Sequence, residues 1–112
     1  RFKYAYLDVE TTKYNLKYFS ENIIYNKGFI PDVFINAKNP KKINWLHIDL
    51  NSNNATLKTL EFFYNKITHN GVILFDDYGG FDDTRKIIDN FFKDKKGNFV
   101  SLPTGQGIFY KK

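Results

Sequence analysis

The chain has 112 residues and is 42% hydrophobic and 19% aromatic, which is enough to build the core of one small domain. It has no cysteine, which excludes disulfides and thiolate metal sites. No apolar run approaches the roughly 18 residues that a membrane helix needs, and no signal peptide is recognisable, so we expect a cytoplasmic protein without a membrane partner.

The formal net charge is +5, from 17 basic and 12 acidic residues. Nucleic-acid binding is one interpretation of this charge. The lysines are scattered or paired, however, so we favour a solvated Lys-rich surface and expect no nucleic-acid partner. The sequence contains no Met and opens on Arg1, which indicates a piece of a longer protein, forming a single partial domain over residues 1–112.

The first forty residues predict short elements. Phe2–Leu7 predicts a strand, Thr11 or Thr12 predicts the cap of a short helix, and Ile23–Tyr25 predicts a short extended run. Residues 31–40, which are bounded by prolines, predict a loop or a short helix.

Two buried strands with a helix between them are predicted in the middle of the chain. Ile43–Leu50 and Val72–Phe75 are the strands. The apolar residues of Ala55–Ile67 recur with the period of a helix. We expect Gly71 to end this helix in the left-handed conformation, with His69 on the surface of the helix end.

The last third of the chain predicts a helix and a hairpin. Asp82 or Asp83 is expected to cap the helix. Phe99–Leu102 and Ile108–Tyr110 predict two strands joined by a loop that contains glycine. The alternation of strands and helices predicts an α/β fold whose sheet is mostly parallel, with an antiparallel hairpin at one edge.

Carboxylates directly follow both central strands: Asp49 follows the first, and Asp76 and Asp77 follow the second. The carboxyl ends of parallel strands meet at one edge of a sheet, where ligands bind. Three carboxylates at one place repel one another unless a cation lies between them. Mg²⁺ or Ca²⁺ suits such oxygen ligands better than zinc does, since both histidines are isolated. The alternative is that each acid only caps a helix or solvates a loop.

Several motifs resemble the macrocin O-methyltransferase (TylF-like) family. They occur in the family's order and spacing, and the resemblance covers roughly residues 23–112. The first motif is similar to the family's KGWFPDT segment. The motifs are Lys27–Asp32 (KGFIPD), Leu46–Asp49 (LHID), Gly71–Gly79 (GVILFDDYG), Thr84–Phe92 and Leu102–Gly107 (LPTGQG).

The resemblance implies a Rossmann-like, class I S-adenosylmethionine-dependent methyltransferase sheet. The two buried strands would be its fourth and fifth, the hairpin its sixth and seventh, and the N-terminal strands would be lacking. Family members methylate hydroxyls of sugars or natural products, and many need Mg²⁺. Asp49, Asp76 and Asp77 are therefore expected to bind Mg²⁺ or another divalent cation beside a sugar-like hydroxyl acceptor. A homo-oligomer is compatible with this picture.

The sequence departs from the family pattern in two places. The family usually reads HIDxDxY, and Asn51 stands where the second acid would serve as a general base, a role that an amide cannot fill. We expect His47 on the other side of the sheet, as a core or cofactor-edge residue. The Gly-rich loop that wraps the cofactor is absent, so no cofactor-binding residue is predicted, and these glycines are interpreted as turn residues: Gly28, Gly71, Gly79, Gly80, Gly105 and Gly107.

Two functions are favoured at this point, and a nucleic-acid module is the third and least favoured. The first is the C-terminal part of a metal-dependent O-methyltransferase, which the acidic set and LPTGQG favour. The second is a non-catalytic fragment or binding domain that retains the fold, which Asn51 favours. Without the first strand of such a sheet, apolar surface should be exposed.

Overall fold

A computed structural model describes residues 8–80 and 82–112, so the strand predicted at Phe2–Leu7 lies outside the described residues. The chain divides into two compact units, residues 1–38 and residues 39–112. Within the described ranges, no helix has the length and apolar character needed to cross a membrane.

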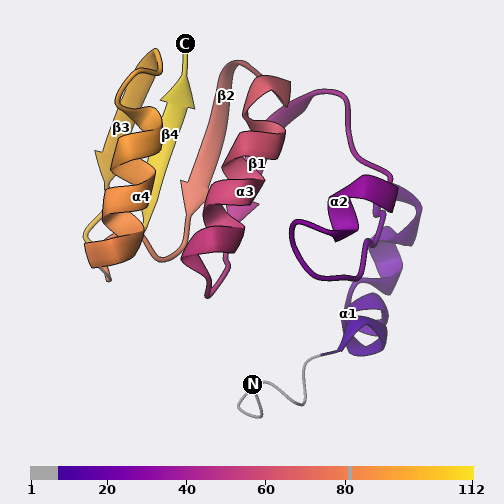
Figure 1. The fold of residues 1–112 in the computed structure, drawn as a ribbon. Coiled ribbons are helices and arrows are strands. Elements are labelled where there is room, and N and C mark those ends of the chain that lie inside the picture. Colours follow the sequence, from indigo (N-terminus) through magenta and orange to yellow (C-terminus); the bar gives the residue numbers. More distant parts are fainter. Residues whose placement is uncertain (1–7, 81) are drawn as a thin grey trace. The chain divides into compact units, whose positions relative to one another are not determined.

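The first unit is built from short helices (Figure 1). These are α1 at Val9–Asn15, the 3₁₀ helix η2 at Lys17–Asn22 and α2 at Val33–Asn36. Asp8 caps α1, because its carboxylate accepts a hydrogen bond from the Thr11 backbone N–H at 2.7 Å. The prediction of Thr11 or Thr12 as the cap was therefore wrong. Ile23–Tyr25 forms no strand, whereas α2 confirms the short helix predicted within residues 31–40.

The second unit contains a four-stranded sheet in the order β1-β2-β4-β3, with α3 and α4 on one face (Figure 1). Its elements are β1 Ile43–Ile48, α3 Asn53–Phe63, η3 Tyr64–Lys66, β2 Ile67–Phe75, α4 Asp82–Phe92, β3 Gly97–Ser101 and β4 Gly107–Lys111. β1 and β2 are parallel, while β4 is antiparallel to both β2 and β3. The predicted α/β class and the C-terminal antiparallel hairpin are confirmed.

Both helices of this unit begin with the polar residues expected at helix starts. The Ser52 hydroxyl accepts a hydrogen bond from the Ala55 backbone N–H at 3.2 Å and so caps α3. Asp82 and Asp83 lie inside the first turn of α4 rather than before it. There their carboxylates interact favourably with the positive end of the helix dipole.

The predicted end of the middle helix was wrong. α3 ends at Phe63, a 3₁₀ turn follows, and Ile67 is the first residue of β2, with only 3% of its surface exposed. Lys111 fixes this turn, because its ammonium donates to the carbonyls of Tyr64 at 3.0 Å and Ile67 at 2.9 Å. Ile67 fitted the helical period but is buried as a strand residue instead.

β2 carries an irregularity close to its start. Between two paired positions β1 advances from Ile43 to Trp45, while β2 advances from Ile67 to Val72. Asn70 takes up the extra length with φ of 67°, so it, and not Gly71, adopts the left-handed conformation. Gly71 is buried in β2 and His69 is an exposed strand residue, which corrects both predictions.

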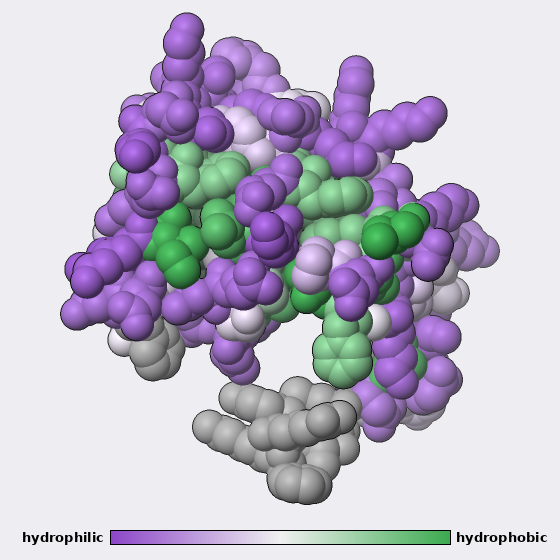
Figure 2. All heavy atoms as spheres, in the orientation of Figure 1, coloured by the Kyte–Doolittle hydropathy of each residue, from purple (hydrophilic) through white to green (hydrophobic). Residues whose placement is uncertain are grey.

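An aromatic-rich core lies between the sheet and the two helices. Leu60 of α3, Ile88 of α4 and Ile73 of β2 are fully buried. Phe92 of α4 stacks on Phe109 of β4, with ring centroids 4.1 Å apart. The outer surface over α3 and α4 is largely hydrophilic, with small apolar patches (Figure 2), as expected for helices that bury one side only.

The opposite face of the sheet carries apolar side chains that are open to solvent. Trp45, Val100 and Tyr110 are 58%, 43% and 41% exposed. Cross-strand pairing places Tyr110 beside Val72, on the face away from Phe109. The expected exposure of apolar surface is confirmed at these three residues.

Gly71→Ala should destabilise the fold by about 1–3 kcal/mol through overpacking. A Cβ at Gly71 would lie 2.7 Å from Ile67 Cγ2 and 2.8 Å from the Thr68 carbonyl oxygen, and the latter belongs to the backbone. A Cβ at Gly80 meets nothing within 4 Å, so Gly80→Ala is the matched control and should change stability by less than about 0.5 kcal/mol. Urea unfolding of both variants checks this, and equal effects would contradict it.

Candidate metal centre

The three predicted carboxylates come together at the carboxyl ends of β1 and β2. Ile48 pairs with Phe75, and the Asp76 backbone N–H donates to the Ile48 carbonyl at 3.0 Å, so the ladder continues past the strands. The next residues are Asp49 on one chain segment and Asp76 on the other. One oxygen each of Asp49, Asp76 and Asp77 lies within 4.8 Å of the other two.

Electrostatics make this arrangement unfavourable without a cation. The pKa of the Asp49 carboxyl is raised from 3.8, first by partial desolvation at the strand ends and then by the charges of Asp76 and Asp77. Oxygen donors from carboxylates, with solvent access for water ligands, form a set that suits Mg²⁺ or a similar hard cation. The residues present therefore fit a divalent cation.

His47 lies on the side of the sheet that carries the acids. Its Nε2 is 3.9 Å from Asp76 Oδ1. The predicted position on the other side was wrong, because residues two apart along a strand, here His47 and Asp49, point to the same face. A positive charge on His47 would lower the pKa of Asp49 and so oppose the effect of the other carboxylates.

The LPTGQG loop contacts the acidic set. The sequence analysis did not predict this contact. Gln106 Nε2 donates to Asp76 Oδ1 at 3.1 Å. The Gly79 backbone N–H donates to the Gly105 carbonyl at 2.6 Å. The loop before β4 thus contacts the segment after β2 through both a side chain and the backbone. The contact follows from the β2–β4 register, which places Gln106 beside Asp76 and which no local pattern in the sequence reveals.

Tyr78 ties the segment after β2 to α4. Its hydroxyl donates to Asp89 Oδ1 at 2.6 Å, and its ring is buried against Phe99, with centroids 4.6 Å apart. Burial first, and then this hydrogen bond to Asp89, raise the pKa of Tyr78 to about 12. Together these contacts hold the turn that follows Asp76 and Asp77.

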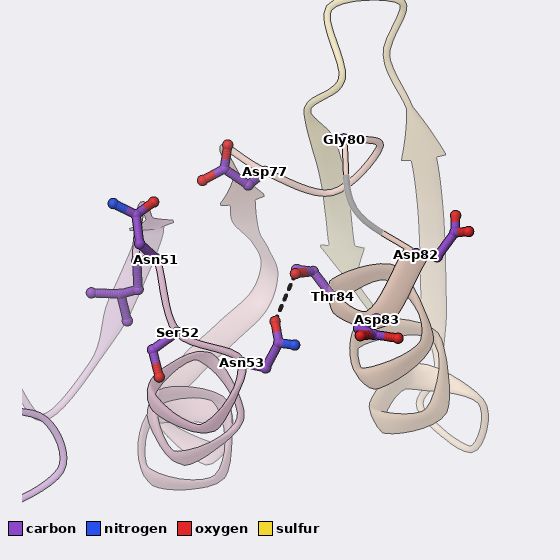
Figure 3. Close-up of a pocket in the computed structure, with 9 residues that line it drawn as sticks. Asn51, Ser52, Asn53, Asp77, Gly80, Asp82, Asp83 and Thr84 are labelled. Atoms are coloured by element: carbon purple, nitrogen blue, oxygen red, sulfur yellow. Dashed lines mark hydrogen bonds between the residues drawn. The ribbon is translucent and has the colours of Figure 1, made fainter.

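A pocket of about 680 Å³ adjoins the acidic set. Figure 3 shows Asn51 and Asp77 at one end of it, at the ends of β1 and β2. Asp82 and Asp83 lie on the side formed by α4, and Thr84 donates to Asn53 Oδ1 at 2.7 Å across the pocket floor. The lining is polar: Leu50, Asn51, Ser52, Asn53, Asp77, Gly80, Asp82, Asp83 and Thr84.

Asp49→Asn should stabilise the cation-free protein at neutral pH. The folded-state pKa of Asp49 lies above 3.8, so in the wild type stability is lost as pH rises from 3.8 through the folded-state pKa. The variant lacks this loss. Thermal unfolding in EDTA between pH 4 and 7 measures the difference in unfolding temperature between the variant and the wild type. This difference should increase with pH and decrease in 1 M salt. A difference in unfolding temperature that does not change with pH would contradict the raised pKa of Asp49.

Tyr78→Phe should destabilise the protein by about 1–2 kcal/mol, because Asp89 loses a hydrogen-bond donor. In the wild type, stability should also fall as pH rises from 10 towards 12, since the unfolded tyrosine ionises first. The variant should lack this component. Tyr110→Phe, at a position that is 41% exposed, is the control and should leave the stability at pH 8 close to wild type. Chemical unfolding at pH 8 to 11 measures both.

Comparisons with known proteins agree with this architecture. The family model of macrocin-O-methyltransferase (TylF) matches residues 5–111. The fold is similar to the solved structure of the O-methyltransferase NovP, with a TM-score of 0.74, 17% sequence identity, and coverage of 95% of this chain and 46% of that one. The chain thus spans about half the length of NovP. No curated protein matches the sequence. The match over nearly all residues shows that the chain belongs to the macrocin O-methyltransferase (TylF) family.

Proposed function

We propose that this chain supplies the metal and acceptor side of an S-adenosylmethionine-dependent O-methyltransferase. The observation that carries the proposal is the convergence of Asp49, Asp76 and Asp77 at the ends of two parallel strands, with oxygens within 4.8 Å of one another. Family membership supports the reaction class. The acceptor would be a small molecule with free hydroxyls, and the cytoplasmic location expected from the sequence belongs to the same proposal.

Asp49, Asp76 and Asp77 would hold Mg²⁺ or a similar divalent cation. Such an ion, when bound, lowers the pKa of an acceptor hydroxyl and fixes its direction. Asp77 belongs both to the acidic set and to the pocket lining, so it connects the cation to the space for the acceptor. The other two carboxylates would complete the protein's share of the ligands, and water and the acceptor would supply the rest.

The pocket beside Asp77 suits a hydroxyl-rich, sugar-like acceptor. Among the described residues, its lining offers amides, hydroxyls and carboxylates, and one large apolar side chain, Leu50. Such groups fix the orientation of a polar ligand. Asn51 can donate to an acceptor hydroxyl or accept from it, but it cannot take up a proton. Within this chain, activation of the hydroxyl would therefore depend on the acidic set.

S-adenosylmethionine would supply the methyl group. The glycines of this chain do not form the loop that wraps this cofactor, so we assign it no contact here. In the described structure, Gly79 and Gly80 lie in the turn after β2, and Gly107 begins β4 beneath the rings of Tyr78 and Phe99. These glycines serve the turn and the close packing around it.

A non-catalytic binding domain is the second candidate, and Asn51 favours it. An amide at the position of the usual base leaves cation binding intact and removes a route for the proton. The two candidates differ in methyl transfer and not in the metal site.

A Mn²⁺ titration of isotope-labelled protein tests the metal site. Amide signals around Asp49, Asp76 and Asp77 should broaden selectively, and excess Mg²⁺ should restore them. Asp76→Asn should weaken Mn²⁺ binding by about 100-fold or more, because loss of even an outer-shell partner costs 10- to 100-fold. Glu61→Gln, which removes a carboxylate from the outer side of α3, is the control and should bind as the wild type does. A folded protein without localised broadening would remove the basis of the proposal.

Methyl transfer itself separates the two candidates. The whole protein is incubated with methyl-labelled S-adenosylmethionine, Mg²⁺ and a panel of acceptors bearing vicinal hydroxyls. Transfer that EDTA abolishes supports the enzyme. Metal binding without transfer to any acceptor, even with Asn51→Asp, would favour the binding domain.

A further inference from the structure

We infer that Gln106 is a positioning residue that orients Asp76 for cation binding. The inference rests on the metal site of the proposed function. Gln106 itself touches neither the cation nor the acceptor in this scheme, and it acts only through the carboxylate of Asp76.

The strand register places Gln106 opposite Asp76. β2 and β4 are antiparallel, and Phe75 pairs with Gly107. One step further along β2 is Asp76, and one step back along β4 is Gln106. The side-chain amide closes this pair, since Gln106 Nε2 donates to Asp76 Oδ1 at 3.1 Å. The contact is thus a direct consequence of the β2–β4 register.

The orientation of the amide is set at its other end. The Thr104 hydroxyl donates to Gln106 Oε1 at 3.1 Å. Because Oε1 accepts from Thr104, the NH₂ group is the end that faces Asp76. With Thr104 holding the oxygen, the amide presents a donor, and not an acceptor, to the carboxylate.

The loop that carries Gln106 is tied to its surroundings at several points. The Leu102 N–H donates to the Gln106 carbonyl at 2.8 Å, and the Gly105 N–H donates to the Leu102 carbonyl at 3.1 Å. The Gly105 carbonyl accepts from Gly79, which lies two residues after Asp77. The amide is therefore held relative to the acids by both backbone and side chain.

Gln106 and His47 both lie near the same oxygen of Asp76. His47 Nε2 lies 3.9 Å from Oδ1, the oxygen that already accepts from Gln106. With Oδ1 engaged by Gln106, we assign Oδ2 as the oxygen that would ligate the cation. A neutral amide orients the carboxylate without cancelling its charge, whereas Lys or Arg at this position would compete with the cation.

Gln106→Met tests the inference, because Met has a similar length and shape without the amide. Mn²⁺ affinity of the whole protein, measured by calorimetry, should fall by about 10-fold or more. The unfolding midpoint in EDTA should move by less than about 5 °C. Thr104→Val should weaken Mn²⁺ binding in the same direction by a smaller factor, and Glu61→Gln should leave it unchanged.

A double-mutant cycle separates positioning from loop stability. If Gln106 acts through Asp76, Gln106→Met should change Mn²⁺ affinity by less than about 2-fold in an Asp76→Asn background. Equal effects in both backgrounds would overturn the inference, as would wild-type affinity in Gln106→Met and Thr104→Val. Absence of Mn²⁺ binding by the wild-type protein would instead overturn the metal site on which the inference rests.

Discussion

The repulsion between three carboxylates at one edge of the sheet is the constraint around which the rest of this unit is arranged. Parallel pairing of β1 and β2 brings Asp49 next to Asp76, and the hydrogen bond from Asp76 to the Ile48 carbonyl keeps them there. Partial desolvation, and then the charges of Asp76 and Asp77, raise the pKa of Asp49. Stability of the fold must come from elsewhere, and it comes from the aromatic core below the acids.

That core reaches the acidic edge through Tyr78. Its ring packs on Phe99, and its hydroxyl binds Asp89 of α4, so the turn after β2 is anchored on both sides. Gly107 allows this approach, because a Cβ there would lie 2.7 Å from Phe99 Cζ and 2.9 Å from Tyr78 Cγ. Close packing against Gly107 thus fixes the position of the turn after β2, which a loop without such contacts would not do.

Much of this unit could be predicted from the sequence, and the failures have identifiable causes. The strands predicted at 43–50 and 72–75 correspond to β1 at 43–48 and to the second half of β2 at 67–75, and the hairpin and the meeting of the three acids were also predicted, because apolar runs and strand-end carboxylates are local signals. The end of α3 was not, because Ile67 satisfies the helical period while Lys111, far along the chain, fixes the turn that buries it in β2. The contact of Gln106 with Asp76 was missed for a similar reason, since it depends on the pairing of two strands.

Asn51 becomes easier to understand in this electrostatic setting. Asn51 and Asp77 lie at the same end of the pocket (Figure 3), so a carboxylate at position 51 would add a fourth charge beside three that already repel one another. It would raise the pKa values of the set and make the cation-free fold less stable. An amide keeps a hydrogen-bonding group in the pocket and avoids this penalty. An amide at position 51 cannot accept a proton, so under the proposed function the activation of a hydroxyl would depend on Asp49, Asp76 and Asp77 and on the side chains that orient them.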